Sequence, residues 1–367
     1  MKDMRKYFGV IEDPRHSGYV IHKLWDILTI VMCGVLCGLD KLDEIVAYQE
    51  NNEENLKKEF GIEKFPSKST ISRVLSVADG KAVGEVMVRV MREGIVERGS
   101  IAAVDGKAIR STGEKGKAHT ALQILSAYMT ENGVTLAQES IHEKTNEIPV
   151  FQEMLEYLDV EGKVVTADAM HCQKETCRKI IEKQGNYVLG LKNNHPTFCS
   201  DITLYFSDVQ FQKEMEWHKS VEKNRNRLER RICRKLTDLS WLECREEWSG
   251  LKCVFSIERI VETGKKRSHE INYYISSLDT SAEQLMKIAR EHWKIESMHW
   301  MLDVTFSEDH CRFSNENAQK TLNAMRKCAL AVHKNFLHNT HKKSSIKSSM
   351  LSALINHSYF CKILAFL

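Results

Sequence analysis

Two short apolar runs that each end in an aspartate most constrain the fold of this chain. Residues 101–104 (IAAV) precede Asp105, and residues 164–167 (VVTA) precede Asp168. A continuous apolar run of this length, in contrast to an alternating one, is typical of a strand that is buried on both faces. We therefore predict two buried strands of an α/β sheet, each with an acid at its carboxyl end.

The segments around these runs complete a regular order of elements. Between them, Glu131-Asn132-Gly133 separates two apolar segments, and Asn-Gly is a favoured hairpin turn. The predicted order is three strands, helix, strand, helix, strand. The predicted ranges are a hairpin at 122–129 and 134–141, helices at 149–158 and 173–184, and a last strand at 187–192.

Residues 281–309 carry a third acid, Glu296, on a predicted helix. Thr280 and Glu283 fit a T-x-x-E capping box, and apolar residues follow at helical spacing. His292, His299 and Asp303 are spaced to share one face with Glu296. From this helix alone, an ordinary ion pair of Glu296 is the simpler interpretation, because interior carboxylates are usually paired.

Residues 1–95 are predicted to be helical. Within them Pro66 is followed by SKSTISR (67–73), which resembles the start of a recognition helix in a helix-turn-helix, with Lys68 and Arg73 as candidate DNA contacts. A solvated amphipathic helix with a serine cap explains the same residues equally well.

Residues 196–279 lose the helical pattern, and we predict a mostly β segment inserted before the last acid. The segment contains a run of predominantly basic residues, which forms either a solvated face or a phosphate-binding surface. The basic residues of this run are Lys223, Arg225, Arg227, Arg230, Arg231, Arg234 and Lys235.

Composition excludes several classes of protein. The net charge of +3 is too small to indicate a nucleic-acid partner by itself. The 11 cysteines contain no C-x-x-C pair and are expected as free thiols in a reducing compartment. The longest apolar run, residues 27–39, is shorter than the ~20 residues that cross a bilayer. We therefore expect a cytoplasmic protein.

Three acids in this order suggest a metal site. Asp105 and Asp168 at strand ends, faced by Glu296 on a helix, would supply the oxygen ligands that Mg²⁺ prefers. Two such ions ~3.5–4 Å apart can activate a nucleophilic oxygen and stabilise a leaving oxygen in phosphodiester chemistry. Each aspartate alone is weak evidence, because an acid after a strand is commonly a turn residue or helix cap.

Long motifs also resemble a known family. The segments AVDGKAIR (103–110), VVTADAMHCQKE (164–175), YYISSL (273–278) and HWKIESMHWMLDVTFSED (292–309) closely resemble the DDE insertion-sequence transposases that include the H-repeat-associated proteins of Rhs elements. Residues 7–28 and 65–75 resemble the N-terminal associated domain of that family. The resemblance covers nearly the whole chain.

The resemblance implies an α/β fold with an RNase H-like catalytic core, a mostly β insertion before the last acid and an all-α N-terminal domain. It implies Asp105, Asp168 and Glu296 as a catalytic triad that binds Mg²⁺, with Mn²⁺ as a substitute. The expected parts are 1–97 (helical, DNA-binding), 98–195 (core), 196–279 (β insertion), 280–340 (core with the Glu296 helix) and 341–367 (tail helix).

The implied activity is cutting at the ends of an insertion sequence and joining the 3′-hydroxyl to target DNA. Terminal inverted repeats and target DNA are the expected partners, with a homodimer or larger assembly on DNA. Two alternatives stay open: a metal-dependent nuclease without strand transfer, and a non-catalytic DNA-binding relic or regulator.

This chain departs from related transposases near Glu296. They carry an arginine four residues before the glutamate and a lysine seven after it, where this chain has His292 and Asp303.

Other candidate residues have simpler alternatives. Lys107 and Arg110 could touch a scissile phosphate or be surface charges. Trp293 and Trp300 are expected to fill core space rather than stack on a base. His171 and Cys172 are expected as ordinary helix-start residues rather than a zinc site.

Overall fold

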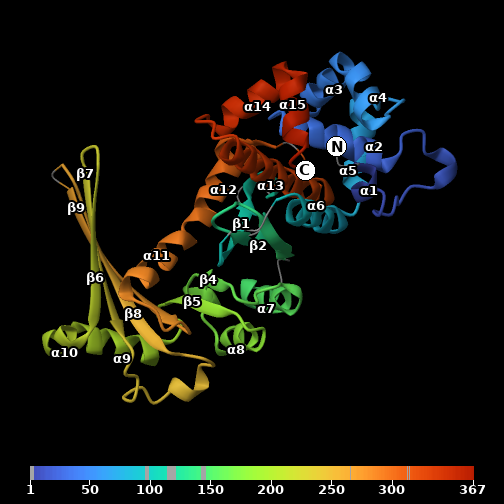
Figure 1. The fold of residues 1–367 in the computed structure, drawn as a ribbon. Coiled ribbons are helices and arrows are strands. Elements are labelled where there is room, and N and C mark those ends of the chain that lie inside the picture. The colour runs from blue at the N-terminus through green and yellow to red at the C-terminus, as the bar shows by residue number, and fades with distance from the viewer. Residues whose placement is uncertain are drawn as a thin grey trace. The chain divides into compact units, whose positions relative to one another are not determined.

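A computed structural model of the chain describes residues 4–95, 99–113, 121–141, 146–264, 266–311, 313 and 315–367. The chain divides into two compact units (Figure 1). Unit one comprises residues 1–99, 106–145 and 296–367, and unit two comprises residues 100–105 and 146–295. The chain therefore passes between the units four times, and each unit is assembled from distant segments.

Unit one begins with a set of short helices, as the sequence predicts for residues 1–95. Side-chain caps start two of them: Ser67 accepts a hydrogen bond from the Thr70 backbone N–H at 3.3 Å, and Asp79 accepts one from Lys81 at 2.9 Å. The helices are α1 (Met4–Phe8), α2 (Leu24–Leu36), α3 (Leu42–Asn51), α4 (Glu53–Phe60), α5 (Lys68–Val77) and α6 (Gly80–Gly94).

Helix α13 (Glu316–Asn339) forms the centre of unit one. It packs against α2, α5 and α6, so that most of its length is buried (Figure 1). Asn315 caps its start by accepting a hydrogen bond from the Ala318 N–H at 3.1 Å. The remaining helices of this region are α12 (Lys294–Val304), α14 (Ile346–Ile355) and α15 (His357–Leu364).

The predicted hairpin is present in unit one. Strands β2 (Leu122–Met129) and β3 (Thr135–Ile141) are antiparallel, and Gly133 has φ of +77°, a left-handed conformation that glycine adopts without a steric penalty. Strand β1 (Ile101–Ile109) neighbours β2, and its residues are divided between the two units.

In unit two, the buried runs form the parallel strands that the sequence predicts. Strands β1 and β4 (Val164–Ala167) are parallel, as are β4 and β5 (Asn186–Leu191). In the chain, α7 (Glu147–Tyr157) precedes β4, and α8 (Lys174–Glu182) lies between β4 and β5. The whole sheet has the order β3-β2-β1-β4-β5-β9-β8-β7-β6. The first five strands have the order of an RNase H-like core, so the predicted fold class is confirmed.

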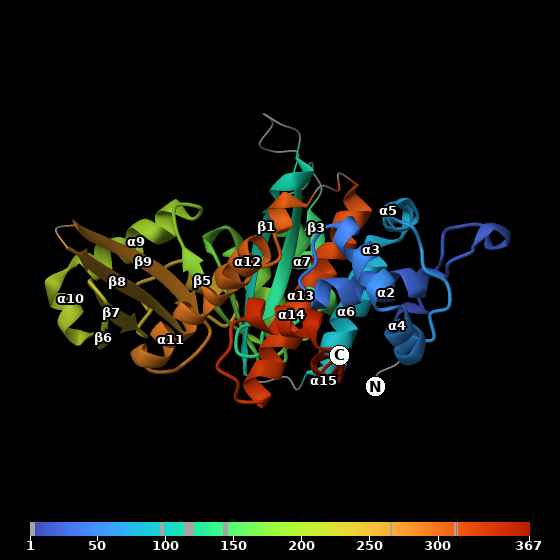
Figure 2. The same cartoon turned by 90° about the horizontal axis from the view of Figure 1, so that it is seen from above.

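The last four strands form an antiparallel sheet of long strands. Tyr274 stacks on Phe255 and packs into the core with α11 (Ala282–His292), whereas Tyr273 meets Phe206 of α9 (Pro196–Ser207). Because neighbouring residues of a strand point to opposite faces, α11 and α9 cover opposite faces of this sheet (Figure 2). The strands are β6 (Glu216–Asn224), β7 (Arg227–Leu236), β8 (Cys253–Thr263) and β9 (Lys266–Ser276).

The predicted mostly β segment begins with two helices that the sequence pattern does not show. Residues 196–214 form α9 and α10 (Val209–Glu214), because Pro196 and Asp208 provide helix starts. Two other local predictions are wrong. The predicted helix over 281–309 is two helices: the Trp293 N–H bonds to the Arg290 carbonyl in a tight turn, and α12 starts anew at Lys294. The cap of α11 is Ser281, which accepts from the Gln284 N–H at 3.3 Å, and not Thr280.

Among the described residues, we find no helix with the length and hydropathy that a membrane span requires.

Candidate active site

Asp105 and Asp168 stand side by side in the sheet register. The last paired residues of the parallel strands β1 and β4 are Val104 and Ala167, and the two aspartates follow them directly. Strand β1 continues to Ile109, beyond the predicted end, because β2 is its neighbour on the other side. The structure therefore brings these two predicted site residues to the same edge of unit two.

The loop that begins at Asp168 is held by several contacts. Asp168 Oδ1 accepts a hydrogen bond from the Met170 N–H at 3.1 Å and caps a short 3-10 helix, Ala169–His171. The Asn194 side chain donates to the Ala169 carbonyl at 2.6 Å. A Cβ built on Gly190 of β5 would lie 3.2 Å from the Ala169 nitrogen. The Asp168 side chain is exposed on this fixed loop.

Two histidine side chains, His292 and His171, lie near the chain segment that carries Asp168. His292 Nδ1 lies 3.2 Å from Thr166 Oγ1, two residues before Asp168. Burial lowers the pKa of His292, although the charge of Asp168 acts in the opposite direction, so the ring is neutral at pH 7. His171 is buried edge-on against Phe151, with ring centroids 5.0 Å apart.

His171 and Cys172 have the structural roles that the sequence favours. His171 ends the short 3-10 helix with Nε2 3.4 Å from Glu147 Oε2. Burial raises the pKa of the Cys172 thiol well above its usual range, so the thiol is unreactive. Within the described ranges, neither residue belongs to a cluster with metal-ligand spacing.

Glu296 lies on α12 in unit one, whereas the two aspartates belong to unit two. Its side chain is exposed, while Ile295, Met298 and Leu302 bury the other face of the helix. His292 lies on α11, so the prediction that it shares a helix face with Glu296 is wrong, because the helix breaks at Trp293.

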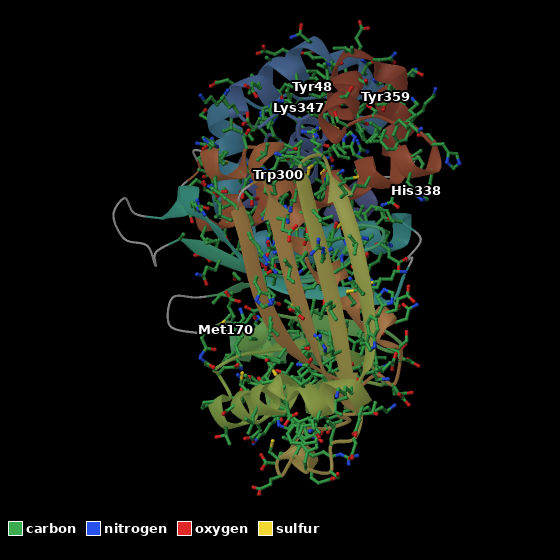
Figure 3. The ribbon with its side chains drawn as sticks, turned by 90° about the vertical axis from the view of Figure 1, so that its left-hand side faces the viewer. Tyr48, Met170, Trp300, His338, Lys347 and Tyr359 are labelled. Carbon is green, nitrogen blue, oxygen red and sulfur yellow. The ribbon has the colours of Figure 1, made fainter. Side chains whose placement is uncertain are left out.

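Both tryptophans of this region are exposed. Trp293 is 57% exposed and Trp300, labelled in Figure 3, is 58% exposed. The prediction that they fill core space is therefore wrong. Trp300 is exposed because α12 turns its apolar face, and not Trp300, towards the core of unit one, whereas Trp293 lies at the break between α11 and α12.

A buried ion cluster surrounds Lys107 in unit one. Its Nζ lies 2.7 Å from Asp303 Oδ1 and 3.0 Å from Glu308 Oε2, and its side chain is 9% exposed. Burial acts to lower the pKa of Lys107, but Glu308 and Asp303 outweigh burial and raise it. A side chain this buried and paired holds β1 to the segment after α12 rather than reaching a phosphate.

Glu308 is the fully buried centre of this cluster. It accepts a hydrogen bond from Asn323 Nδ2 at 2.9 Å, and its Oε1 lies 3.4 Å from Arg326 Nη1. Burial opposes its ionisation, but Arg326 and Lys107 outweigh burial and hold the pKa of Glu308 below its usual range. Arg110, by contrast, is 85% exposed and lies 3.8 Å from Asp309.

A second buried cation lies on the same helix as Arg326, and sequence reasoning missed it. Lys327 of α13 donates to Ser126 Oγ at 2.7 Å and to Gln138 Oε1 at 3.1 Å. Burial lowers the pKa of Lys327 to about 7, although Glu308 acts to raise it. In the sequence, Arg326-Lys327 resembles the solvated face of a helix. Only the tertiary contacts of Lys327 show that its side chain is buried.

Most of the basic run on β7 is neutralised by acids on neighbouring strands. Arg230 lies 3.6 Å from Glu262, and Arg234 lies 3.0 Å from Glu258. Arg227 and Arg231 both pair with Glu229. These ion pairs favour a cross-strand structural role for the middle of the run.

The tip of the β6–β7 hairpin differs from the middle of the run. Lys223 and Arg225 are exposed and have no ion pair among the described parts of the chain. Lys266 and Arg267 begin β9 at the adjacent tip and are exposed too. The register pairs Thr263 with both Arg227 and Lys266, so the two tips lie side by side. We call Lys223, Arg225, Lys266 and Arg267 the basic tip.

Helix α5 begins at a serine cap, Ser67, as expected for a solvated amphipathic helix. Its two basic residues, Lys68 and Arg73, have different neighbours. Lys68 Nζ lies 2.7 Å from Asp43 Oδ2. Arg73 lines a surface hollow of about 420 Å³ together with Arg15, Tyr19 and His22 of the segment between α1 and α2. The sequence did not suggest this loop as a neighbour of α5.

Comparisons with known proteins decide the family. A family model described as "Transposase DDE domain" matches residues 97–332, and one described as "DDE_Tnp_1-associated" matches residues 5–91. The chain belongs to the DDE transposase family. The predicted family is therefore confirmed over nearly the whole chain.

Relatives of this family match from end to end. The chain is 34% identical to "Putative transposase YncI" of Escherichia coli O157:H7, with 100% of this chain and 95% of the relative covered. It is 30% identical to "H repeat-associated putative transposase YhhI" of Escherichia coli K12, with 100% and 98% covered.

A solved structure shares the fold. The cryo-EM structure of the piggyBac transposase synaptic complex with hairpin DNA matches with a TM-score of 0.50 and 10% identity, over 99% of this chain and 76% of that chain. At this identity the likeness supports the RNase H-like fold class alone.

Proposed function

We propose that this transposase cuts DNA at the ends of an insertion sequence and joins the freed 3′-hydroxyl to target DNA, with Asp105, Asp168 and Glu296 as its catalytic acids. The observation that carries the proposal is the register of β1 and β4, in which Asp105 and Asp168 follow directly after the paired residues Val104 and Ala167. Glu296, exposed on the polar side of α12, is proposed as the third acid.

The two aspartates fit hard divalent cations. They offer carboxylate oxygens from one sheet edge, and the Asp168 carboxylate is exposed on a loop that is fixed by Asn194. We propose that Asp105, Asp168 and Glu296 hold Mg²⁺, with Mn²⁺ as a substitute. When bound, such ions favour ionisation of an attacking hydroxyl and neutralise charge on a leaving oxygen.

The proposed reaction has two phosphodiester steps. In the first, water adds to a phosphorus atom at the element end, and the bond to the 3′-oxygen breaks to give a 3′-hydroxyl and a 5′-phosphate. In the second, that 3′-hydroxyl attacks a phosphorus atom of target DNA and releases a target 3′-hydroxyl. The contribution of the chain is to orient the reacting groups and to fix the acids, which supports in-line geometry.

DNA contacts are proposed at exposed cations. Arg110, which directly follows β1, and the basic tip are open to solvent and suited to phosphates. Arg73 and the loop residues around the α5 hollow are proposed as a second contact. Since an element has two ends, we propose a homodimer or larger assembly on DNA, in the cytoplasm of a bacterium.

The test is cleavage and strand transfer on labelled DNA that carries the element's own terminal repeats, with Mg²⁺ or Mn²⁺. Glu296→Gln and Asp168→Asn keep side-chain size and remove a charge. We expect both variants to bind DNA as the wild type does and to yield neither cut nor joined products. Glu283→Gln, which changes an exposed glutamate in the first turn of α11, is the matched control and is expected to retain both activities.

Three other results would change the proposal. Cut products without joined products would favour a nuclease of the same fold. Binding without cutting by the wild type, with either metal, would favour a DNA-binding relic or regulator. Full activity in Glu296→Gln would remove Glu296 from the catalytic acids.

A further inference from the structure

Three side chains with metal-binding groups, from α15 and α4, meet in unit one. His357 and Cys361 lie one turn apart on α15, and Glu59 lies near the end of α4. His357 Nε2 lies 3.6 Å from Glu59 Oε1 and 3.4 Å from Cys361 Sγ. One ligand atom of each residue lies within 4.8 Å of the other two, and no other group of this kind is found within the described residues.

The spacing of these atoms fits a tetrahedral zinc ion. Zinc binds histidine nitrogen and carboxylate oxygen at about 2.0–2.2 Å and cysteine sulfur at about 2.3 Å. In a tetrahedron these lengths separate a nitrogen from an oxygen by about 3.4 Å and a nitrogen from a sulfur by about 3.6 Å. The observed separations of 3.6 Å and 3.4 Å are close to these values. The sulfur and a carboxylate oxygen lie within 4.8 Å of each other, so a metal requires these two atoms to approach by at most about 1.2 Å.

The surroundings leave one side of the cluster accessible. The Glu59 side chain is 13% exposed and the His357 side chain is 33% exposed. Three protein ligands with an accessible side leave room for a water as the fourth ligand. The combination of thiolate, imidazole and carboxylate selects zinc over Mg²⁺, which prefers oxygen ligands alone.

The scaffold of the cluster does not depend on a metal. Phe360 and Ile363 bury the other face of α15, and the Phe360 ring packs 6.4 Å from the ring of Tyr48 of α3, a residue labelled in Figure 3. Asn356 caps the start of α15 by accepting a hydrogen bond from the Tyr359 N–H at 3.0 Å. We therefore expect variants of the three ligands to fold.

We propose that Glu59, His357 and Cys361 bind one zinc ion, with a water as fourth ligand, and that this ion joins the last helix of the chain to its N-terminal helices. The thiol proton of Cys361 is released to solvent when the sulfur binds the metal. The site uses none of the residues proposed for catalysis, so it stands apart from the proposed function. The simpler alternative is a thiol–imidazole hydrogen bond beside a His–Glu ion pair, without any metal.

The test measures zinc on the full-length protein. The wild type, Cys361→Ser, His357→Asn and the control Cys199→Ser are stripped with a chelator and titrated with Zn²⁺ in excess Mg²⁺, which occupies the carboxylate sites. Cys199 is a partly exposed cysteine of α9 in unit two. We expect one zinc per chain in the wild type and in Cys199→Ser, and affinity at least about 100-fold weaker in the two ligand variants.

Two further readouts connect zinc to these residues. Co²⁺ in place of zinc is expected to give thiolate-to-metal charge-transfer absorption in the wild type and none in Cys361→Ser. Chelation is expected to lower the midpoint of thermal unfolding of the wild type by several degrees and to leave that of Cys361→Ser unchanged. Circular dichroism of each variant checks that it is folded, and Glu59→Gln replaces any variant that is not.

The proposal is overturned if the wild type takes up no zinc in excess Mg²⁺. It is also overturned if folded Cys361→Ser and His357→Asn bind zinc as tightly as the wild type. DNA cleavage is not a readout of this site, so an inactive protein that binds zinc at this cluster would contradict the proposed function and leave the zinc site standing.

Discussion

Lys107 of β1 and Asp303 of α12 form an ion pair, with Nζ 2.7 Å from Oδ1. Asp303 lies seven residues, or about two turns, after Glu296, and Lys107 lies two residues after Asp105. The pair therefore connects the strand that carries one proposed catalytic acid to the helix that carries another.

Lys107→Met is expected to destabilise the protein by about 3 kcal/mol, because Glu308 would lose a cation while remaining fully buried. Arg326 and Asn323 would still contact Glu308, which keeps the loss from being larger. Urea unfolding, with the midpoint and slope compared, measures the change.

Arg110→Gln is the matched control for that experiment. Arg110 is 85% exposed and its surface pair with Asp309 is worth at most about 1 kcal/mol. Equal stability losses in the two variants would contradict the interpretation that the buried pair holds the strand to the helix.

The sequence predicts elements whose signals are local. The apolar runs before Asp105 and Asp168 are strands, and Asn132-Gly133 lies in the turn of a hairpin. Both signals, a continuous apolar run and a turn dipeptide, consist of residues adjacent in the sequence. The register that brings the two aspartates together follows from parallel pairing. The placement of Asp105 and Asp168 at neighbouring strand ends was therefore accessible to sequence reasoning.

Other features depend on partners that are far apart in the chain. Lys107 and Glu308 are 201 residues apart, and Glu308 looks like one more surface acid in the sequence. The break at Trp293 has no glycine or proline nearby to signal it, and the division between the two units falls just after it, between Ile295 and Glu296. Tertiary structure, and not helix propensity, therefore decides these positions.

Lys327 is expected to make stability depend on pH. Its pKa is lowered to about 7 by burial, against about 10.4 in an unfolded chain. Between these values the unfolded chain binds more protons, so the free energy of unfolding rises with pH. The rise from pH 7 to pH 9 is expected to be on the order of 2 kcal/mol.

Urea unfolding at several pH values measures this rise, and Lys327→Met is the comparison. The variant is expected to lack the rise, whatever its stability at a single pH. Lys334→Met on the same helix, whose Nζ donates to the Tyr128 hydroxyl at 2.7 Å, is the control and should keep it. The same slope in Lys327→Met and the wild type would show that other groups titrate.

The basic tip is expected to bind the phosphates of DNA. Lys223→Gln with Arg225→Gln should weaken binding to all DNA sequences alike, because phosphate contacts carry no sequence information. The slope of log affinity against log salt should fall by about 2, because each of the two removed cations would otherwise neutralise one phosphate. Fluorescence anisotropy at several salt concentrations measures both effects.

Lys252→Gln is the control for the basic tip. Lys252 is exposed just before β8 begins, at the end of that strand away from the tip. If Lys252→Gln lowers the salt slope as much as the double variant does, the binding reflects general charge rather than the tip.

Gly190→Ala is expected to reduce cleavage more than stability. The new Cβ would lie 3.2 Å from the Ala169 nitrogen and 3.6 Å from the Asp168 carbonyl carbon, so the loop that carries Asp168 must shift by a few tenths of an ångström. Small displacements of catalytic groups cost far more rate than stability: we expect a loss of about tenfold or more in cleavage rate and about 1 kcal/mol in stability.

Single-turnover cleavage and thermal unfolding of the same preparations measure the two effects of Gly190→Ala. Gly18→Ala is the control, because its Cβ would be 3.5 Å from His16, an ordinary van der Waals distance. DNA affinity is expected to stay unchanged in Gly190→Ala, since Gly190 does not lie among the proposed DNA contacts. Full cleavage activity in a stable Gly190→Ala protein would mean that the position of Asp168 tolerates this shift, and would weaken its assignment as a catalytic acid.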